Sequence, residues 1–281
     1  MDSFTREISV ARELALAAGK LILTYRGTGV DVDRKAGDEP VTRADREASE
    51  LIMAGLARAF PEDIIISEEA ADDRRRLEPG HRVWFIDPLD GTKDFIRNLP
   101  GFSVMIGLCI GARPRAGVVY QPVGDRLYWA AEGQGAWMVA EGGEGTADRR
   151  LHVSPTTDVS KVRLVASASH RTGKIDQVKS TLGIADELQI GSVGLKLGLI
   201  ALAERDLYVN PSSKSKTWDT AAPEIILHEA GGRISDLWGS PLHYDAPDMW
   251  HRRGLLASNG ALHEDVLARL KPLFPSPGSD E

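Results

Sequence analysis

The chain has 281 residues, 42% of them hydrophobic, and carries a formal net charge of -7 with a pI near 5.6. This acidic balance disfavours a protein that binds a nucleic-acid polymer, because phosphate contacts need clustered lysine and arginine side chains. No apolar run reaches the ~18 residues that a membrane span needs, and the N-terminal segment mixes charges into each turn, unlike a signal peptide. We therefore expect a soluble, cytoplasmic protein with no membrane partner.

The single cysteine, Cys109, lies in the apolar run F-S-V-M-I-G-L-C-I. One cysteine cannot form a disulfide within the chain, which fits a reducing compartment. We expect Cys109 to be a small core residue rather than a reactive thiol.

Hydrophobic periodicity predicts two helices and then a run of strands. Residues 4–25 keep helical spacing up to Gly27, and a second helix opens at Thr42 and ends before Pro61. Beyond this point Gly and Pro turns separate short buried runs, which is typical of an antiparallel meander. The expected strands cover residues 64–67, 82–87, 102–110, 115–122 and 125–131.

Strands and helices alternate in the last third of the chain, which favours α/β layering. The expected elements are a strand at 163–170, helices at 174–182 and 193–203, a strand at 206–210, a helix from about Thr220, strands at 232–236 and 254–259, and a terminal helix. We place a domain boundary near residue 155. The N-terminal domain, 1–155, would be α+β with an antiparallel sheet, and the C-terminal domain, 156–281, would be α/β.

The segment W-F-I-D-P-L-D-G-T-K-D-F brings Asp87 and Asp90 to the carboxyl end of an expected buried strand, where open α/β sites form. The carbonyl of Leu89 lies between them, and Mg²⁺ takes carboxylate and carbonyl oxygens. Gly91 and Thr92 open a helix-like segment whose free N–H groups favour a phosphate. A solvated turn is the alternative, because D-P and D-G are common turn dipeptides.

Further acidic residues follow expected strand ends or helix starts. I-I-I-S-E-E ends a buried strand in Glu68 and Glu69, and Asp219 comes just before the expected helix of W-D-T-A-A-P-E-I-I-L-H-E-A-G-G. Asp45 lies in V-T-R-A-D. Each has a local alternative: Asp219 could complement a helix N-terminus, Asp45 could form a capping box with Thr42, and Glu69 could be solvated.

Taken together, D-P-L-D-G-T and W-D-T-A-A-P-E-I-I-L-H-E-A-G-G resemble the lithium-sensitive, magnesium-dependent phosphatase superfamily. That superfamily includes inositol monophosphatases, fructose-1,6-bisphosphatases and 3'(2'),5'-bisphosphate nucleotidases. The match runs from P-V-T-R-A-D to L-L-A-S-N. The resemblance implies a layered α-β-α-β-α sandwich of the sugar phosphatase type, a small phosphate ester as substrate, Mg²⁺ as cofactor with two to three ions per site, lithium inhibition, and a monomer or homodimer.

The resemblance also implies a set of metal ligands, most of them in the N-terminal domain. Glu68, Asp87 and the carbonyl of Leu89 would hold one Mg²⁺. Asp87, Asp90 and Asp219 would hold a second, and Glu68 with waters a weaker third. Two such ions can clamp an in-line displacement at phosphorus, one beside the attacking water and one beside the leaving oxygen.

By the same resemblance, Asp45 and Thr92 would orient and deprotonate the attacking water. This role and the capping geometry of Asp45 are compatible. Phosphoryl transfer needs positioning and charge neutralisation more than covalent help, so no Ser or Cys nucleophile is required.

D-G-T-K-D-F, S-A-S-H and G-S-V-G-L-K-L resemble the nucleotidase branch, including the bacterial CysQ type, whereas inositol monophosphatases typically read D-G-T-T-N-F. The C-terminal domain would then supply contacts to the nucleotide and its second phosphate, from Ser167, His170, Ser192 and Lys196. Alternatives are a surface histidine, a helix N-cap at Ser192 and a solvated Lys196. Ala168 stands where many nucleotidases carry Arg, and an Arg-to-Ala change loses a phosphate-binding guanidinium.

We expect a Mg²⁺-dependent phosphatase that converts adenosine 3',5'-bisphosphate to AMP, with Lys216, close to Asp219, as a further substrate contact. An inositol or sugar phosphatase with the same metal site is the alternative. A non-catalytic anion- or metal-binding regulator is disfavoured by the complete set of acidic residues. A dinucleotide enzyme is disfavoured because no G-x-G-x-x-G follows a strand.

Overall fold

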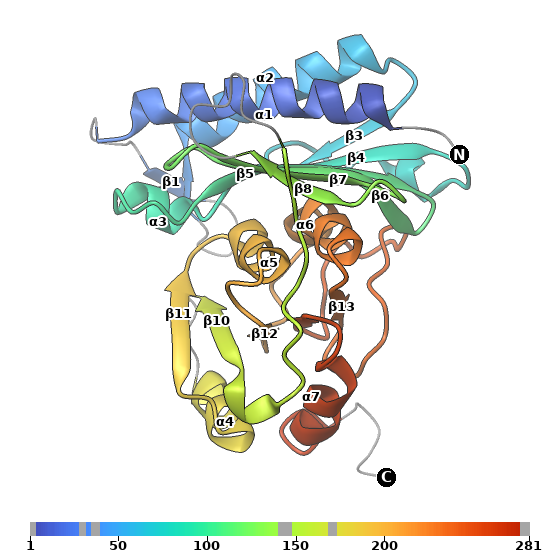
Figure 1. Cartoon of the computed structure of the whole chain (residues 1–281). Helices are drawn as coiled ribbons and strands as arrows, with labels where there is room; N and C mark the ends of the chain where they lie inside the picture. The colour runs from blue at the N-terminus through green and yellow to red at the C-terminus, as the bar shows by residue number, and fades with distance from the viewer. Residues whose placement is uncertain (1–3, 28–31, 35–39, 140–147, 168–172, 276–281) are drawn as a thin grey trace.

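Two N-terminal helices cover one face of a large sheet (Figure 1). Helix α1 (Thr5–Tyr25) and helix α2 (Arg43–Ala59) contact each other and the middle strands of that sheet. The computed structural model describes residues 4–27, 32–34, 40–139, 148–167 and 173–275. In these parts of the chain no helix is both long and apolar enough to cross a membrane.

The large sheet has seven strands in the order β3-β4-β5-β6-β7-β8-β9. Every pair beyond β4 is antiparallel, as the meander pattern predicted, but β3 is parallel to β4. Residues 68–81 make the long crossover that a parallel pair requires. The strands are β3 (Ile64–Ser67), β4 (Arg82–Asp90), β5 (Ser103–Ile110), β6 (Arg113–Gln121), β7 (Arg126–Ala131), β8 (Ala136–Val139) and β9 (Arg149–Arg150).

A second, five-stranded sheet has the order β11-β10-β12-β14-β13. Strand β10 is parallel to both neighbours, and β14 is antiparallel to β12 and β13, so this half has the expected α/β character. The prediction missed the edge strand β11, because its mostly exposed residues D-E-L-Q-I lack a buried face. The strands are β10 (Arg163–Ser167), β11 (Asp186–Ile190), β12 (Leu207–Asn210), β13 (Arg233–Ser235) and β14 (Leu255–Ser258).

Helices separate the two sheets and cover the outer face of the second one (Figure 1). Helices α5 (Val193–Ala201) and α6 (Thr217–Glu229) form the middle layer, and α6 packs on strands β5 and β6. Helices α4 (Gly173–Leu182) and α7 (His263–Leu270) form the last layer, where their apolar residues join those of β12 and β14. The boundary near residue 155 stays a prediction.

The remaining described elements are short. They are β1 (Val32–Arg34), β2 (Pro40–Thr42), α3 (Thr92–Ile96), and the 3₁₀ turns η1 (Arg74–Leu77) and η2 (Val159–Lys161). Strands β1 and β2 form a two-stranded ribbon just before α2.

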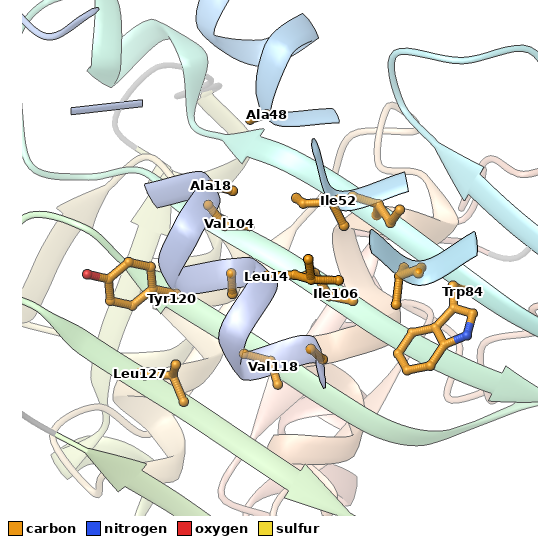
Figure 2. Close-up of a cluster of buried hydrophobic side chains, with 14 of the residues drawn as sticks. Leu14, Ala18, Ala48, Ile52, Trp84, Val104, Ile106, Val118, Tyr120 and Leu127 are labelled. Atoms are coloured by element: carbon orange, nitrogen blue, oxygen red, sulfur yellow. The ribbon is translucent and has the colours of Figure 1, made fainter. Parts of the chain in front are cut away.

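An apolar cluster holds the first two helices to the large sheet. Figure 2 shows Leu14 and Ile52, from α1 and α2, facing Trp84, Ile106 and Val118 of three neighbouring strands. All five are less than one-tenth exposed. Burying a large aliphatic side chain in this way contributes about 1.5–3 kcal/mol, so this layer anchors the strands that end at the site described below.

Two facing glycines let α6 rest directly on the large sheet. Gly107 of β5 and Gly117 of β6 are register partners. A Cβ at Gly107 would lie 2.6 Å from the backbone nitrogen of Ala222, and one at Gly117 would lie 2.6 Å from its carbonyl oxygen. The absence of side chains therefore fixes the height of α6 above the sheet, and with it the position of Asp219 in the first turn of that helix.

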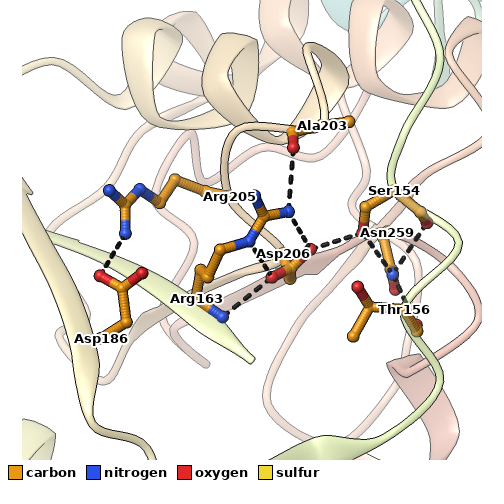
Figure 3. Close-up of polar contacts among 8 residues, drawn as sticks. All are labelled: Ser154, Thr156, Arg163, Asp186, Ala203, Arg205, Asp206 and Asn259. Atoms are coloured by element: carbon orange, nitrogen blue, oxygen red, sulfur yellow. Dashed lines mark hydrogen bonds and ion pairs between the residues drawn. The ribbon is translucent and has the colours of Figure 1, made fainter. Parts of the chain in front are cut away.

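A buried carboxylate ties the second sheet together. Figure 3 shows Asp206, at the start of β12, accepting hydrogen bonds from Arg163 and Ser154. Asn259 donates to the carbonyls of Ser154 and Thr156. The side chain of Asp206 is fully buried, and the hydrogen bonds from Arg163 and Ser154 hold its pKa below the ordinary value despite that burial. The network joins β10, β12 and the segment that enters from the large sheet.

We expect Gly117→Ala to lower the free energy of unfolding by about 1–3 kcal/mol, because the new methyl group must push α6 away from the sheet. Urea unfolding followed by circular dichroism measures this change. Gly173→Ala is the matched control, since a Cβ at Gly173 meets no atom within 4 Å. Equal stability of the two variants would show that close packing of α6 is not required.

Candidate active site

A pocket of about 490 Å³ opens where the two sheets and the middle helix layer meet. Carboxyl ends of β3 and β4, the first turns of α3, α5 and α6, and the end of β12 all contribute to it. The predicted site residues that line it are Glu68, Asp87, Leu89, Asp90, Gly91, Thr92, Ser167, Lys196, Lys216 and Asp219. The fold thus brings together residues that lie far apart in the sequence.

The parallel pairing of β3 with β4 places Glu68 beside Asp87. The backbone N–H of Glu68 donates to the carbonyl of Ile86 at 3.1 Å, which continues the ladder into the pocket. The predicted antiparallel arrangement was wrong for this pair, and it would have put the two acids at opposite edges of the sheet. Glu69 is half-buried and is not among the residues lining the pocket, which agrees with its interpretation as a residue that is not a ligand.

Strand β4 ends in an irregular turn, and this turn directs the carboxylates of Asp87 and Asp90 into the pocket. The register of β4 against β5 shifts between Asp87 and Asp90. The Asp87 carboxylate accepts the N–H of Leu89 at 3.0 Å, which fixes the turn. Gly91 follows with φ of 95°, and a Cβ there would lie 2.6 Å from the carbonyl oxygen of Gly101. Only glycine fits this conformation and this space.

Asp45 has the predicted capping contact and also contacts Thr92, although Asp45 itself is not among the residues that line the pocket. One carboxylate oxygen accepts the N–H and the hydroxyl of Thr42 at 2.8 and 2.6 Å, which confirms the capping box of α2. Its other oxygen lies 3.2 Å from the hydroxyl of Thr92, which donates to it or to the carbonyl of Leu89 at 3.1 Å. The capped helix therefore holds a buried carboxylate against a hydroxyl at the pocket wall.

Asp219 lies within the first turn of α6, not before the helix as predicted. The helix begins at Thr217 because the Asp219 carboxylate accepts the backbone N–H of Lys216 at 2.9 Å, in the manner of a capping box. The N–H of Thr217 is bonded to the carbonyl of Met249. The expected interaction with a helix N-terminus is thus present, and the same side chain lines the pocket.

Asp90 is held by the N-terminus of α5. The hydroxyl of Ser192 donates to it at 2.6 Å, and the N–H of Gly194 donates at 3.1 Å. Ser192 is also the N-cap of α5, where it accepts the N–H of Leu195, and it bonds to Ser103. The N-cap alternative for Ser192 is therefore correct, and its hydroxyl contacts a predicted metal ligand.

Lys196 is a buried residue of the pocket lining rather than a solvated side chain on its helix. Its side chain amine donates to the carbonyl of Gly191 at 2.5 Å and lies 5.2 Å from the ring centroid of Tyr208. Burial lowers the pKa of Lys196 to about 8, against the opposing effect of Asp90, Asp94 and other acids. Its cation partly offsets the carboxylates above it. His170 lies outside the described residues.

The carboxylates crowd one another. Loss of solvent raises the pKa of Asp87 and of Asp219 well above the ordinary value, and the charges of Glu68 and Asp90 raise them further. Burial also raises the pKa of Asp90, although Lys196 and the hydrogen bond from Ser192 oppose that change. A divalent cation would relieve this repulsion.

The chemical type of the predicted ligand atoms suits Mg²⁺. It consists of carboxylate oxygens and a backbone carbonyl, the hard oxygen ligands that Mg²⁺ prefers. Within the described ranges, no three acidic, histidine or cysteine side chains already surround a single point as a closed metal cage. The fit of the site to a metal therefore rests on the chemistry and the charge of its donors.

Comparison with known proteins agrees with this geometry. The model of the inositol monophosphatase family matches residues 5–273. The chain belongs to the inositol monophosphatase family. Its fold is the predicted layered sandwich: the structure of CysQ from Bacteroides thetaiotaomicron superposes with a TM-score of 0.74 at 30% identity, covering 91% of this chain and 97% of that one.

Curated relatives in this family carry different substrate names. The 3'(2'),5'-bisphosphate nucleotidase CysQ of Escherichia coli K12 is 35% identical over 248 residues, which cover 88% of this chain and 97% of the relative. The histidinol-phosphatase of Mycobacterium tuberculosis is 30% identical over 266 residues, which cover 94% of this chain and 97% of the relative. Both names describe phosphatases, and they differ in the ester that is cleaved.

A buried polar chain supports the helix that carries Asp219. The Tyr244 hydroxyl donates to Glu224 at 2.6 Å and lies 3.0 Å from the hydroxyl of Thr220, which in turn lies 2.7 Å from a ring nitrogen of His251. Glu224 also lies 3.1 Å from Arg113. Sequence reasoning missed this network, because its members come from three segments with no shared motif.

Burial raises the pKa of Glu224 to about 7 from an ordinary 4.5, although Tyr244 and Arg113 lower it. The folded protein therefore retains a proton that the unfolded chain loses, and the free energy of unfolding falls as pH rises from about 4.5 to 7, by up to about 3 kcal/mol. We expect Glu224→Gln to remove this pH-dependent contribution to the free energy of unfolding. Its stability relative to the wild type, from urea unfolding at pH 4–8, should increase with pH. A pH-independent difference would contradict the raised pKa.

Proposed function

We propose that this phosphatase-family chain is a Mg²⁺-dependent enzyme that removes the 3'-phosphate of adenosine 3',5'-bisphosphate to give AMP. The observation that carries the proposal is the contact between Asp45 and Thr92 at the wall of a pocket lined by Glu68, Asp87 and other acids. It places a proton acceptor next to a set of oxygen donors, which is what metal-assisted hydrolysis requires. The similarity to CysQ nucleotidases and the sequence D-G-T-K-D-F support the nucleotide substrate.

The proposed metal ligands are the carboxylates of Glu68, Asp87, Asp90 and Asp219 and the carbonyl of Leu89. Bound Mg²⁺ would neutralise phosphoryl oxygens and make a water more acidic. Hydrogen bonds at the helix starts and in the turn of β4 position three of these donors, Asp87, Asp90 and Asp219.

The chain's own groups would activate the water. When the Thr92 hydroxyl donates to Asp45, its lone pairs face outward and can accept a hydrogen bond from a water in the pocket. Attack on phosphorus would pass a proton through Thr92 to the Asp45 carboxylate, while the oxygen of the departing 3'-hydroxyl takes a proton from solvent. Backbone N–H groups at Gly91 and Thr92 are our candidates for contacting the phosphate.

The proposed nucleotide contacts are Ser167, His170, Ser192 and Lys196. Ser167 and Lys196 line the pocket, whereas Ser192 is not among the lining residues and donates a hydrogen bond to Asp90. This chain has Ala168 where many nucleotidases have an Arg. The other proposed nucleotide contacts would therefore have to contribute more of the affinity for the nucleotide. A cytoplasmic location, a monomer or homodimer, and inhibition by lithium stay expectations.

A second candidate is a phosphatase for a monophosphate such as histidinol phosphate or inositol phosphate. Histidinol-phosphatases among the relatives favour it, since their similarity extends over nearly the whole chain. It would use the same metal site and differ in the contacts to the alcohol. A non-catalytic regulator is the least supported, because it would not need the contact between Asp45 and Thr92.

A phosphate-release assay in Mg²⁺ tests the substrate assignment. We expect kcat/KM for adenosine 3',5'-bisphosphate to exceed that for inositol 1-phosphate and histidinol phosphate by about a hundredfold, or roughly 2.7 kcal/mol of transition-state discrimination. Fructose 1,6-bisphosphate serves as a bisphosphate without a nucleoside. Undetectable turnover of the nucleotide, beside rapid hydrolysis of a monophosphate, would transfer the assignment to the second candidate.

We expect Asp45→Asn to lower kcat by about 10²–10⁴-fold with little change in KM, because it removes the proton acceptor and leaves the substrate contacts in place. The amide oxygen can still accept a hydrogen bond from the backbone of Thr42, so the helix should persist. Glu50→Gln, on an exposed position of the same helix, is the control and should keep full activity. Comparable activity of both variants would exclude Asp45 as the acceptor.

A further inference from the structure

One wall of the pocket is basic and belongs to the segment that connects β12 to α6. This segment, N-P-S-S-K-S-K, shares the pocket with the acidic residues that follow β3, end β4 and begin α6, and its Lys216 lies 3.9 Å from Glu68. Its residues that line the pocket are Asn210, Ser212, Lys214, Ser215 and Lys216. The pocket therefore offers two environments to the anionic groups of a ligand. One is the set of carboxylates, which would bind an anion through metal ions, and the other is the pair of lysines, which would bind an anion directly.

Hydrogen bonds fix the course of this segment. The Asn210 side chain donates to the Ser215 hydroxyl at 2.8 Å and accepts the N–H of Ser212 at 3.0 Å. The carbonyl of Ser215 accepts the N–H of His251 at 2.8 Å. Fixing the backbone before a ligand arrives lowers the entropy that binding must offset.

Lys216 is oriented by the groups around it. Its side chain nitrogen lies 4.6 Å from the Trp250 ring centroid, 5.2 Å from that of Trp218 and 3.9 Å from a carboxylate oxygen of Glu68. These contacts place its charge next to the predicted metal ligands. Its backbone is extended and forms a β-bridge with Trp250.

Lys214 stands farther out on the same wall. It is exposed, whereas Lys196 is 1% exposed and bonded to the carbonyl of Gly191. Lys214 and Lys216 both line the pocket, so their two positive charges lie on the same wall. An exposed cation on a fixed backbone can bind an anion at low desolvation cost.

We infer that Lys214, with Lys216 beside it, forms a subsite for a second anionic group of the substrate, the phosphate that is not hydrolysed. The inference rests on the proposed phosphatase function and names the feature that would select bisphosphates over monophosphates. Charge-assisted contacts between ammonium and phosphate are among the stronger polar interactions. A pocket of about 490 Å³ is also in the size range that accommodates a nucleotide-sized ligand.

The test compares two lysine variants of the protein, each assayed with two nucleotide substrates. Lys214→Met keeps the length of the side chain and removes its charge, and Lys20→Met, on an exposed position of α1, is the control. Adenosine 3',5'-bisphosphate and adenosine 3'-monophosphate share the scissile ester and differ only in the 5'-phosphate. We expect Lys214→Met to lower kcat/KM for the bisphosphate by about 10–100-fold and for the monophosphate by less than threefold, and Lys20→Met to change neither.

Equal losses on the two substrates, or no loss on either, would overturn the subsite. Calorimetric titration of both nucleotides in Mg²⁺ separates this failure from failure of the proposed function. A wild-type chain that hydrolysed neither nucleotide, yet bound the bisphosphate more tightly in a Lys214-dependent way, would refute the hydrolysis and keep the subsite. Binding of the two nucleotides that did not depend on Lys214 would refute the subsite even if both were hydrolysed.

Discussion

Several carboxylates of like charge share one poorly solvated pocket, and the surrounding structure acts to keep them there. Such groups repel one another and resist ionisation, which the raised pKa values of Asp87 and Asp219 express. The fold opposes this repulsion with backbone N–H groups at helix starts, which bind Asp90 and Asp219, and with the buried cation of Lys196. The residual repulsion would favour the binding of divalent cations.

Two features of the packing bring the acidic residues of the site close together. The crossover between β3 and β4 puts Glu68 and Asp87 at the same edge of the large sheet. The glycines at 107 and 117 let α6 lie flat on that sheet, so that Asp219 comes from a different half of the chain into the same pocket. The cost is a site that is less stable than an apolar one would be, as is common where function requires clustered charges.

Most of the acids that line the candidate site could be picked out from the sequence, because they lie in short motifs at strand or helix ends. Their roles as metal ligands came from the resemblance to the family and stay predictions. Long periodic segments such as α1 were also predictable. The parallel direction of β3 depends on a crossover that no local pattern encodes, and the start of α6 depends on a side chain that caps its own helix. Lys214 was missed because a lysine in a polar connection is usually solvated, and only the tertiary structure turns that connection toward the pocket.

The central claim is that Glu68, Asp87, Asp90 and Asp219 form one divalent-cation site. A crystal of the full chain soaked in Mn²⁺, a cation with the same preference for oxygen ligands, tests it directly through anomalous difference density. The account predicts density between the carboxylates of Glu68, Asp87, Asp90 and Asp219. Density elsewhere on the molecule with an empty pocket, or no bound ion at millimolar Mn²⁺, would contradict it.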